Sequence, residues 1–474
     1  MTLRLLAATA LALAGCAAWN KPINAPLSGS NAPLAAEAPA DDDGIYIGLA
    51  FSGGGMRASA FAFGMTEALR EAGVLDRVRL VSGVSGGSVT AAQLGLYGPQ
   101  GLVGYRERYL LTDAEKYMAN SALNPLTIVR GLSGGANGRA TFARYLDEVL
   151  FRKATFGDMA AQSRIKTWIN ATDMANSTPF LFSAETFDAL CSDLASFPIS
   201  EAVAASAAFP LVFSPVVLEA HQGKCDYAEP DWLTAARFNP EASSAMRAHA
   251  RALESYADRE GVKFVKLLDG GVTDNFGTTG LAVERARAQA PHAPMTPAEA
   301  VRLKRLLFLV ADAGVSRDPA WSQKIAGPGG PALAMSIANA SLSAATRSGY
   351  DAMRGEMRRW HAELIEWRCA LPATEVRRLR GSTAGWDCRD VKLFVGQANS
   401  DALPSEMRAQ LNKVPTRLRL KPDEVDLSIA AGRTATLATP EFNGFLATLD
   451  EGGIERRIAE GIARGGRRIA PTGN

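Results

Sequence analysis

The feature that most constrains the fold is a unit of strand, glycine turn and helix that occurs twice between residues 45 and 96. The first copy has the apolar run IYIGLAFS at residues 45–52, the turn GGGMR at residues 53–57, and then apolar residues at helical spacing. The second copy passes from an apolar run at residues 78–81 through SGVSGGS at residues 82–88 into another helix-like stretch. Strands that alternate with helices predict an α/β fold in which a mostly parallel sheet is covered by helices on both faces. Ligands bind such sheets at the carboxyl ends of the strands, where both glycine turns are expected.

Three further apolar runs of strand length follow, at residues 165–169, 264–268 and 306–310. The last two lead into turns that combine an acidic residue with glycine, at Asp269 and at Asp312. Both aspartates are therefore expected at the same edge of the sheet as the two glycine turns.

The composition is that of an ordinary globular protein and excludes several functional classes. The 474 residues are 47% hydrophobic, with 51 Lys and Arg against 49 Asp and Glu, which leaves a formal net charge of +2. So small a net charge offers no electrostatic footprint for nucleic acid, and the hydrophobic content excludes a disordered chain. We expect one large α/β domain over residues 44–318 and a helical extension over residues 319–474 that completes it.

The first residues, MTLRLLAATALALAGC, combine a basic start, an apolar run and small residues before Cys16. This pattern predicts an export signal over residues 1–15, whose apolar run is too short to span a bilayer. The segment LAGC also resembles the lipobox of bacterial lipoproteins, which implies that Cys16 becomes an acylated first residue that anchors the protein to a membrane. Ala17 rather than Asp follows the cysteine, which in that resemblance favours the outer membrane. An ordinary signal peptide with an incidental cysteine is the alternative.

The stretch within residues 16–43 is rich in Ala, Pro, Asn and Ser and shows no apolar periodicity after the cysteine. It is predicted to be a flexible tether. The acidic run at residues 41–43 lacks the spaced oxygen ligands of a calcium loop, so we assign no metal site to it.

Export would allow disulfides to form, and four cysteines remain when the proposed lipidation site is set aside. Three connectivities are possible. We favour the two local pairs because each would close a short polar excursion that contains Gly or Pro. These pairs are Cys191 with Cys225 and Cys369 with Cys388. Four free buried thiols are the alternative.

The turn at residues 53–57 has two competing uses. With Ala58 it satisfies GxGxxA, the pattern of a dinucleotide-binding turn. Such a site would need an acidic residue at the end of the second strand, where Ser82 and Gly83 stand instead. The other use is the stabilisation of an anionic oxygen by unobstructed backbone N–H groups at a helix N-terminus. We favour this second use because a nucleophile lies nearby in the sequence.

The nucleophile is supplied by GVSGG at residues 83–87, which matches the GxSxG elbow of serine hydrolases. In that elbow a sharp turn between strand and helix exposes the serine. Small neighbours let the serine stand clear, and here they are Gly83, Gly86 and Gly87. A second match, GLSGG around Ser133, has loop composition and no helix start immediately behind it. The context therefore favours Ser85 as the nucleophile.

The serine needs a general base, and the sequence favours a carboxylate. The chain has four histidines, and none of them stands at the end of a predicted strand beside glycine. Asp269 ends a predicted strand and precedes two glycines that admit close approach, and burial would raise its pKa towards the range of a working base. Asp312 is a reserve candidate, although aspartates at strand ends more often hold loops. A histidine-dependent hydrolase stays open as a variant.

Together, the turn at residues 53–57, the elbow at Ser85 and the DGG turn at Asp269 resemble the patatin-like phospholipases, a family of Ser-Asp acyl hydrolases. Further segments are similar to ones common in that family and occur in the same order: TFGD at residues 155–158, ASAAFP at residues 205–210 and DGGVTDN at residues 269–275. A weaker similarity lies at residues 414–416. The resemblance covers about residues 45–315, and Ala58 departs from it because many members have Gly there.

The resemblance implies a three-layer domain of patatin type in which Ser85 is the nucleophile and Asp269 is its base. It also implies an oxyanion hole at the glycine turn, which comprises Gly53, Gly54, Gly55, Met56 and Arg57. The implied reaction is the hydrolysis of lipid carboxylic esters, of phospholipase A or lysophospholipase type, through an acyl-enzyme and without metal or other cofactor. The Arg57 side chain is expected to point away from the dyad, because its charge would lower the pKa of Asp269.

Two functions of different classes stay open. The first is a lipid acyl hydrolase that acts on lipid esters, and the second is a catalytically silent lipoprotein that uses the fold to bind lipid or a partner protein. Residues 345–380 carry eight arginines and two tryptophans and could lie on anionic lipid. Five interleaved acidic residues favour a solvated, salt-bridged helix instead.

Overall fold

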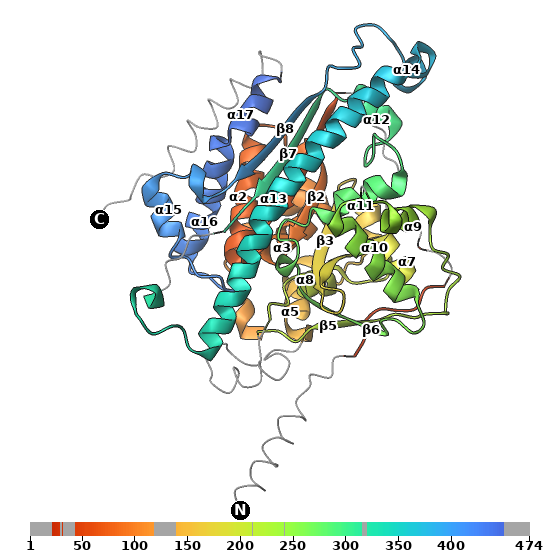
Figure 1. Ribbon diagram of the computed structural model, residues 1–474. Helices are drawn as coiled ribbons and strands as arrows, with labels where there is room; N and C mark the ends of the chain where they lie inside the picture. Colours follow the sequence, from red (N-terminus) through yellow and green to blue (C-terminus); the bar gives the residue numbers. More distant parts are fainter. Residues whose placement is uncertain are drawn as a thin grey trace, which may run out of the picture.

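The computed structural model describes residues 21–28, 31, 43–117, 139–210, 212–240, 242–314 and 320–449 (Figure 1). Its centre is a sheet of eight strands in the order β5–β6–β3–β2–β1–β7–β8, with β4 paired to β3 beside this path. The strands are β1 (Ile45–Phe51), β2 (Val78–Val84), β3 (Lys166–Asp173), β4 (Thr178–Leu181), β5 (Val216–Glu219), β6 (Phe264–Asp269), β7 (Arg305–Ala311) and β8 (Lys392–Ala398).

Helices surround the sheet (Figure 1). They are α2 (Gly55–Glu71), α3 (Gly86–Tyr97), α5 (Arg139–Leu146), α6 (Phe156–Gln162), α7 (Ala184–Ala189), α8 (Ile199–Ser206), α9 (Asp231–Phe238), α10 (Ser244–Ala257), α11 (Thr279–Ala288), α12 (Pro297–Arg302), α13 (Gly330–Ala370), α14 (Ala373–Arg380), α15 (Ser405–Leu411), α16 (Pro422–Ala438) and α17 (Pro440–Ala447). Short helical turns include η5 (Asp147–Phe151), η6 (Gly270–Val272) and η7 (Ala320–Gln323).

The sheet is mostly parallel, which confirms the expected fold class. The pairs β3–β2, β2–β1, β1–β7 and β7–β8 are all parallel. By contrast, β4 and β6 pair antiparallel with β3, and β5 pairs antiparallel with β6. The expectation that Asp269 ends a strand parallel to the others is therefore wrong, because β6 runs in the opposite direction.

The first strand shows why helices are needed on both faces. Its residues Ile47, Leu49 and Phe51 belong to a core that includes apolar residues of α2, α3 and α16. Tyr46 and Ala50 belong to a second core that includes apolar residues of α13. Successive side chains of a strand point to opposite faces of a sheet, so an apolar run such as β1 must be covered twice.

The C-terminal extension is part of the sheet domain. It contains the expected helices, but it also adds the edge strand β8, which the sequence reading did not identify. Its helix α16 packs so closely on α2 that two positions of the contact have no room for a side chain. A Cβ on Gly432 would lie 2.0 Å from the Phe61 carbonyl oxygen, and one on Gly64 would lie 2.1 Å from the Ile429 carbonyl oxygen.

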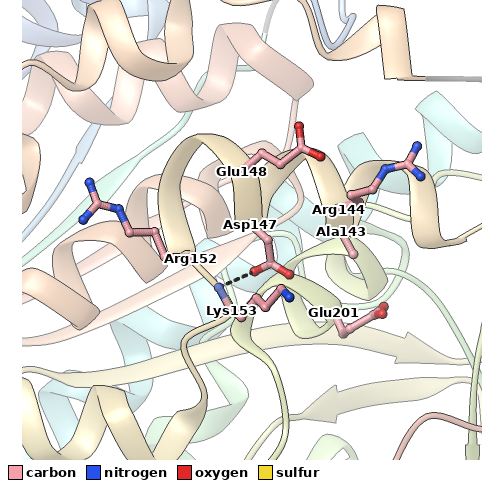
Figure 2. Close-up of a pocket in the computed structure, with 7 residues that line it drawn as sticks. All are labelled: Ala143, Arg144, Asp147, Glu148, Arg152, Lys153 and Glu201. Atoms are coloured by element: carbon pink, nitrogen blue, oxygen red, sulfur yellow. Dashed lines mark hydrogen bonds between the residues drawn. The ribbon is translucent and has the colours of Figure 1, made fainter.

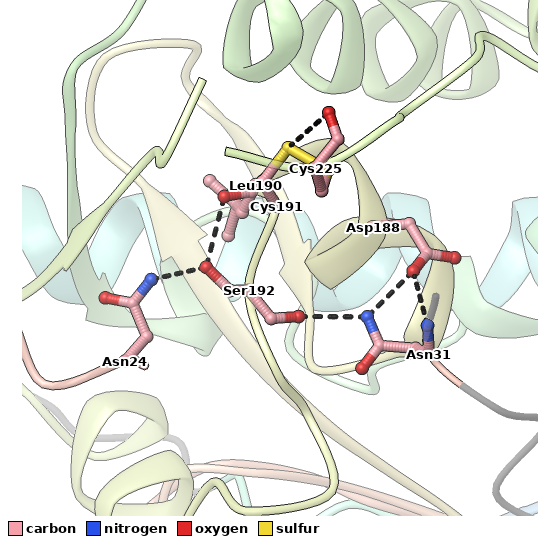
Figure 3. Close-up of a disulfide and its surroundings, with 7 residues drawn as sticks. All are labelled: Asn24, Asn31, Asp188, Leu190, Cys191, Ser192 and Cys225. Atoms are coloured by element: carbon pink, nitrogen blue, oxygen red, sulfur yellow. Dashed lines mark hydrogen bonds between the residues drawn. A yellow bond between two sulfur atoms is a disulfide. The ribbon is translucent and has the colours of Figure 1, made fainter. Parts of the chain in front are cut away.

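Part of the predicted tether is docked on the body of the protein (Figure 3). The Asn24 amide donates to the Ser192 hydroxyl at 2.6 Å, and the Asn31 amide donates to an Asp188 carboxylate oxygen at 2.7 Å. The prediction of a flexible tether over residues 16–43 is therefore wrong at these positions. The reason is that asparagine side chains, which read as loop composition, here pair with polar groups of a segment far away in the sequence.

Both disulfides follow the local connectivity that the sequence analysis favours. Cys191 and Cys225 are joined with a Cα–Cα distance of 5.4 Å, and Cys369 and Cys388 with a distance of 4.9 Å. The first lies directly beside the docked N-terminal residues (Figure 3). Cross-links of this kind suit a protein that folds in an oxidising compartment.

Some sequence predictions fall outside the described residues. They are the export signal over residues 1–15, the lipidation of Cys16 and the second GxSxG match at Ser133. Within the described ranges, no helix combines the length and the apolar character required to cross a bilayer.

Candidate active site

The elbow at Ser85 forms as the sequence predicts. β2 ends at Val84 and α3 begins at Gly86, so Ser85 is the only residue between strand and helix. Its backbone has φ of 51° and ψ of −124°, a region that L-residues seldom adopt and that is retained mainly at functional sites. The side chain stands at the end of the strand, next to the N-terminus of a helix.

The elbow glycines are required by contacts with neighbouring backbone. A Cβ on Gly83 would lie 2.6 Å from the Ser88 Cα. A Cβ on Gly86 would lie 1.9 Å from the Gly55 carbonyl oxygen, and one on Gly87 would lie 2.5 Å from the Phe51 carbonyl oxygen. Each glycine is therefore present because another part of the backbone occupies the space of a side chain.

The Ser206 hydroxyl fixes the backbone of the elbow through two hydrogen bonds. The Ser85 backbone N–H donates to the Ser206 hydroxyl at 2.8 Å, and that hydroxyl donates to the Asn170 carbonyl oxygen at 2.6 Å. Ser206 ends α8 and is buried. The sequence analysis noted its segment, residues 205–210, as similar to one in the patatin-like phospholipases but gave the serine no role.

Asp269 reaches Ser85 through the register of three strands. Val84 pairs with Asn170 on β3, and the next residue of β3, Ala171, pairs with Asp269 on β6. Ser85, which follows Val84, and Asp269 therefore flank Ala171 in one row across the sheet. Because β6 is antiparallel, its last residue meets this row from the opposite direction. The sequence analysis thus placed Asp269 at the correct edge for an incorrect topological reason.

The Asp269 carboxyl is buried, with 4% of its surface exposed. Burial raises its pKa from the ordinary value of 3.8 to about 6, against the lowering effects of the Ser85 side chain and of a hydrogen bond from the Gly271 N–H. The Gly271 N–H lies 2.9 Å from the carboxylate. The arrangement supplies a serine side chain that interacts with a buried carboxylate able to accept a proton near neutral pH.

The glycine turn of residues 53–57 lies against the elbow. A Cβ on Gly53 would lie 3.2 Å from the Ser85 Cβ. Gly54 and Gly55 have φ of 140° and 63°, values that favour glycine, and a Cβ on Gly55 would lie 2.6 Å from the Arg417 carbonyl oxygen. The turn therefore brings bare backbone next to the serine, as an oxyanion site requires.

The N–H groups of this turn are not equivalent. Gly53 donates to the Asn275 side chain at 3.0 Å, and Met56 donates to the Arg417 carbonyl oxygen at 2.8 Å. Among the residues that the structure describes, no acceptor is found for the N–H groups of Gly54 and Gly55. These two amides, at the N-terminus of α2, are the ones available to an anionic oxygen.

Gly86 adds a third amide on the other side of Ser85. No described group accepts its N–H, which opens helix α3. In a nucleophile elbow the residue after the nucleophile contributes one N–H to the oxyanion hole. The sequence analysis assigned Gly86 to the elbow only.

The side chain of Arg57 points away from the dyad, as expected. It is buried and donates to the Ala313 carbonyl oxygen at 3.2 Å and to the Val414 carbonyl oxygen at 2.8 Å. Arg57 therefore ties the glycine turn to the segment after β7 and to the C-terminal extension, and it is not among the groups that shift the pKa of Asp269.

Asp312, the reserve base, is occupied elsewhere. One carboxylate oxygen accepts the Gly314 N–H at 2.9 Å, and the other accepts the Gln397 side-chain amide at 2.8 Å. Asp312 thus joins the loop after β7 to the end of β8, and its role in the structure is to hold that loop.

The four histidines contact groups other than Ser85 and Asp269. His221 lies near the Asn24 carbonyl oxygen, at 3.4 Å, and His292 contacts the Met295 carbonyl oxygen at 2.8 Å. His361, which lies on α13, contacts the Val391 carbonyl oxygen at 2.9 Å. His249 is buried on α10, and burial lowers its pKa to about 4. None of them takes part in a hydrogen bond with Ser85 or Asp269.

Asn275 links the glycine turn to α13. Its carbonyl oxygen accepts the Gly53 N–H, and its amide donates to the Thr346 hydroxyl at 2.8 Å. One turn earlier on the same helix, Leu342 lies over Gly271, where a Cβ would come within 2.6 Å of the leucine side chain. The long helix α13 therefore covers the turn that carries Asp269, a contact that the sequence pattern did not reveal.

The residues that the structure describes hold no cluster of three or more His, Cys, Asp or Glu side chains arranged to bind a metal ion. A surface depression of about 560 Å³ lies on α5, η5 and α8 (Figure 2). It is lined by Ala143, Arg144, Asp147, Glu148, Arg152, Lys153 and Glu201, three cations and three carboxylates beside one alanine. None of the dyad or oxyanion residues lines it, so it is separate from the candidate active site.

Comparison with known proteins places this geometry in context. Residues 49–282 match the model of a family described as patatin-like phospholipase. A comparison with curated proteins found no match.

Three solved structures resemble the chain at a distance. VipD from Legionella pneumophila is 14% identical with a TM-score of 0.33, over 94% of this chain and 79% of that one. Human GIVD cytosolic phospholipase A2 is 11% identical with a TM-score of 0.37, over 89% of this chain and 61% of the human one. The heterodimeric ExoU–SpcU complex of Pseudomonas aeruginosa gives 16% identity and a TM-score of 0.21, over 76% of this chain and 64% of that one. These likenesses are too distant to carry an argument about substrate or mechanism.

Proposed function

The chain belongs to the patatin-like phospholipase family, and from that premise we propose that it hydrolyses carboxylic esters of lipids through a Ser85–Asp269 dyad and an acyl-enzyme. One observation carries the proposal. The side chain of a serine on a strained elbow interacts with a buried carboxyl whose pKa burial raises to about 6. A silent lipid-binding protein has no need of either the backbone strain or the raised pKa.

In the first half of the reaction, the Ser85 Oγ attacks the ester carbonyl carbon while Asp269 accepts the hydroxyl proton. The carbonyl oxygen becomes an anion, and the N–H groups of Gly54, Gly55 and Gly86 are the donors available to it. The carbon–oxygen bond to the leaving alcohol then breaks, and Asp269 returns the proton to the alcohol oxygen. The alcohol or lysolipid leaves, and the acyl group remains on Ser85.

In the second half, water attacks the acyl carbon and Asp269 takes a proton from it. The same amides stabilise the second oxyanion, and the Ser85–acyl bond breaks as the proton passes to Ser85 Oγ. The fatty acid is released and the dyad is restored. These steps require no metal or cofactor, since the proton and the charge are each handled by groups already named.

The dyad is tested by replacing Ser85 with Ala and measuring ester hydrolysis and labelling by a serine-reactive fluorophosphonate. We expect turnover to fall by a factor of about 10³ or more and labelling to disappear. Ser133→Ala is the matched control, because Ser133 lies in the second GxSxG match, and it should leave both readouts unchanged. Equal turnover in the Ser85→Ala variant and the wild type would contradict the dyad, and an unlabelled wild type would favour the silent lipoprotein.

We also propose that the protein is an exported lipoprotein, acylated at Cys16 and anchored in the outer membrane. The basis is the signal pattern of residues 1–16 and a pair of disulfides that suit an oxidising compartment. Metabolic labelling with an alkyne fatty acid should mark the wild type and not a Cys16→Ser variant. Labelling that persists in the variant would show that the acylated residue is not Cys16.

A further inference from the structure

The two halves of α13 differ sharply in chemistry. From Ile325 to Thr346 the chain has no charged residue, whereas the rest of the helix is rich in arginine and glutamate. The charged half is attached to the body: Met357 and Trp360 are buried in the second core, and Glu356 and Glu363 pair with Arg285 of α11. Two arginines of this half also form ion pairs, Arg359 with Glu356 and Arg368 with Asp390.

The uncharged stretch, which begins before α13 at Ile325 and continues into its first half, presents apolar side chains to solvent. Ile325 is fully exposed, and Leu333 and Ile337 are 47% and 59% exposed. Only seven large hydrophobic residues are exposed in the described part of the chain, and three of them lie in this one stretch. Single exposed apolar residues are common, but a concentration of them in an uncharged segment marks an interaction surface.

The exposed apolar residues Leu333 and Ile337 lie on the same helix as two residues that contact the candidate active site. Leu333 and Ile337 are four residues apart and share one face of the helix, while Leu342 and Thr346 share another. The helix turns about two and a half times between Leu333 and Leu342, so these two side chains point in opposite directions. Leu342 lies over Gly271 and Thr346 accepts a hydrogen bond from Asn275. Leu333 and Ile337 therefore lie about 14 and about 8 Å along the helix from Leu342, which contacts the site.

The docked N-terminal residues point to the same side of the molecule. Figure 1 shows the start of the described chain and the amino-terminal end of α13 toward the same, lower side of the view. Residue 21 follows the proposed acylation site by five residues, which can span at most about 18 Å. An acyl anchor at Cys16 would therefore hold this side of the body close to the membrane surface.

We propose that the segment from Ile325 to Ile337 is the surface by which this protein enters the interface of a lipid bilayer, with a zwitterionic membrane as its partner. The absence of charge across the segment favours apolar insertion over attraction to anionic headgroups. The proposal rests on the proposed function, since it states how a lipid ester reaches the dyad from a bilayer.

The test uses the full chain with Cys16→Ser in every sample, so that no acyl anchor holds the protein to lipid. Sedimentation with phosphatidylcholine vesicles and hydrolysis of vesicle lipid are compared with hydrolysis of a soluble short-chain ester. The variant Leu333→Glu/Ile337→Glu should lose vesicle binding and vesicle hydrolysis by about tenfold or more and keep its activity on the soluble ester. The matched controls Phe238→Glu and Val103→Glu, at positions 72% and 59% exposed on other elements, should change none of these readouts.

A second measurement does not depend on loss of binding. An Ile337→Trp variant should show a blue-shifted difference spectrum against its parent when phosphatidylcholine vesicles are added, whereas Phe238→Trp should show none. Binding should change little between about 0.05 and 0.5 M salt, a range that strongly screens interactions between exposed charges.

The outcomes separate the two proposals. Vesicle binding that the double Glu variant retains, or that requires phosphatidylglycerol and disappears at high salt, would overturn the docking surface even if hydrolysis depends on Ser85. A double variant that changes the oligomeric state in place of vesicle binding would show that a second copy covers the patch and would also overturn it. Loss of vesicle binding in the double variant, with no Ser85-dependent hydrolysis in any sample, would support the surface and refute the proposed reaction.

Discussion

Two buried aspartates, one at the end of β6 and one directly after β7, look alike in the sequence. Asp269 precedes Gly270 and Gly271, and Asp312 precedes Ala313 and Gly314. Each accepts the backbone N–H two residues ahead at 2.9 Å, and burial raises the pKa of both. They differ in the second group that each carboxylate contacts. The Asp269 carboxylate faces the Ser85 side chain, whereas the second oxygen of Asp312 accepts a hydrogen bond from the Gln397 amide.

The difference shows that burial and a raised pKa do not make a general base on their own. A carboxylate acts as a base when it faces the hydroxyl whose proton must move. When it faces an amide, which donates a hydrogen bond but does not transfer its proton, the same carboxylate has only a structural role. The electrostatic field also differs, because the Arg57 cation lowers the pKa of Asp312 but is absent from the groups that shift the pKa of Asp269.

The largest expected effect separates the two residues by activity. Asp269→Asn removes the proton acceptor while preserving the shape of the side chain, and kcat/KM should fall by a factor of about 10² to 10⁴. Asp312→Asn should retain most of the activity, because Asp312 does not face Ser85. Kinetics with one soluble ester for both variants check this, and equal losses would erase the distinction.

The pH dependence of activity sharpens the comparison. Only the ionised form of Asp269 can accept the proton, so kcat/KM should rise as pH increases through about 6, near the pKa of that group. Below that pH the rate should drop about tenfold per pH unit. The midpoint should stay in place in Asp312→Asn, and a midpoint that moves with Asp312 would make that residue the titrating base.

Stability should change in the opposite direction from activity at Asp269. An acid whose pKa is raised on folding binds more protons in the folded state, so the stability it contributes is present below about pH 4 and is lost as pH rises to about 6. Asp269→Asn removes the buried charge and should raise the free energy of unfolding at pH 8 by up to about 3 kcal/mol, from 1.36 kcal/mol per pKa unit.

Urea unfolding of Asp269→Asn and the wild type at pH 8 and at pH 4 measures this effect. The two proteins should differ at pH 8 and converge at pH 4. A variant that is less stable than the wild type at both values would show that the carboxylate stabilises the fold, as expected of a structural role.

The smallest effect concerns the hydrogen bond between Asp312 and Gln397. Gln397→Leu removes the amide that donates a hydrogen bond to Asp312. The free energy of unfolding should fall by about 1.5 to 3 kcal/mol, the range for a hydrogen bond to a charged group. Activity should stay near the wild-type level. Combining Gln397→Leu with Asp269→Asn should restore no activity, because a freed Asp312 still does not face Ser85.

Local spacing was sufficient to predict much of the site. The alternation of apolar runs, glycine turns and helical stretches specifies the β1–α2 and β2–α3 units, because these depend on contacts between residues close in sequence. The choice of Ser85 follows from the strand before it and the helix after it. The local disulfide pairs could be predicted for the same reason.

The remainder depends on contacts that no local pattern encodes. Ser206 holds the elbow from α8, and Asn275 and Arg417 take up the N–H groups of Gly53 and Met56. The antiparallel course of β6, the addition of β8 and the docking of the N-terminal asparagines are likewise decided by segments distant in the chain.

By itself the sequence determined the chemical groups at the site: a serine on an elbow, a carboxylate before two glycines and a turn free of side chains. Only the tertiary structure decided which carboxylate faces the serine, which amides remain open to an oxyanion and which apolar residues near the start of α13 are exposed. The physical reason is that the local pattern sets the direction of each turn. A carboxylate becomes a base, and an amide becomes an oxyanion donor, only through the partners that other strands and helices place beside it.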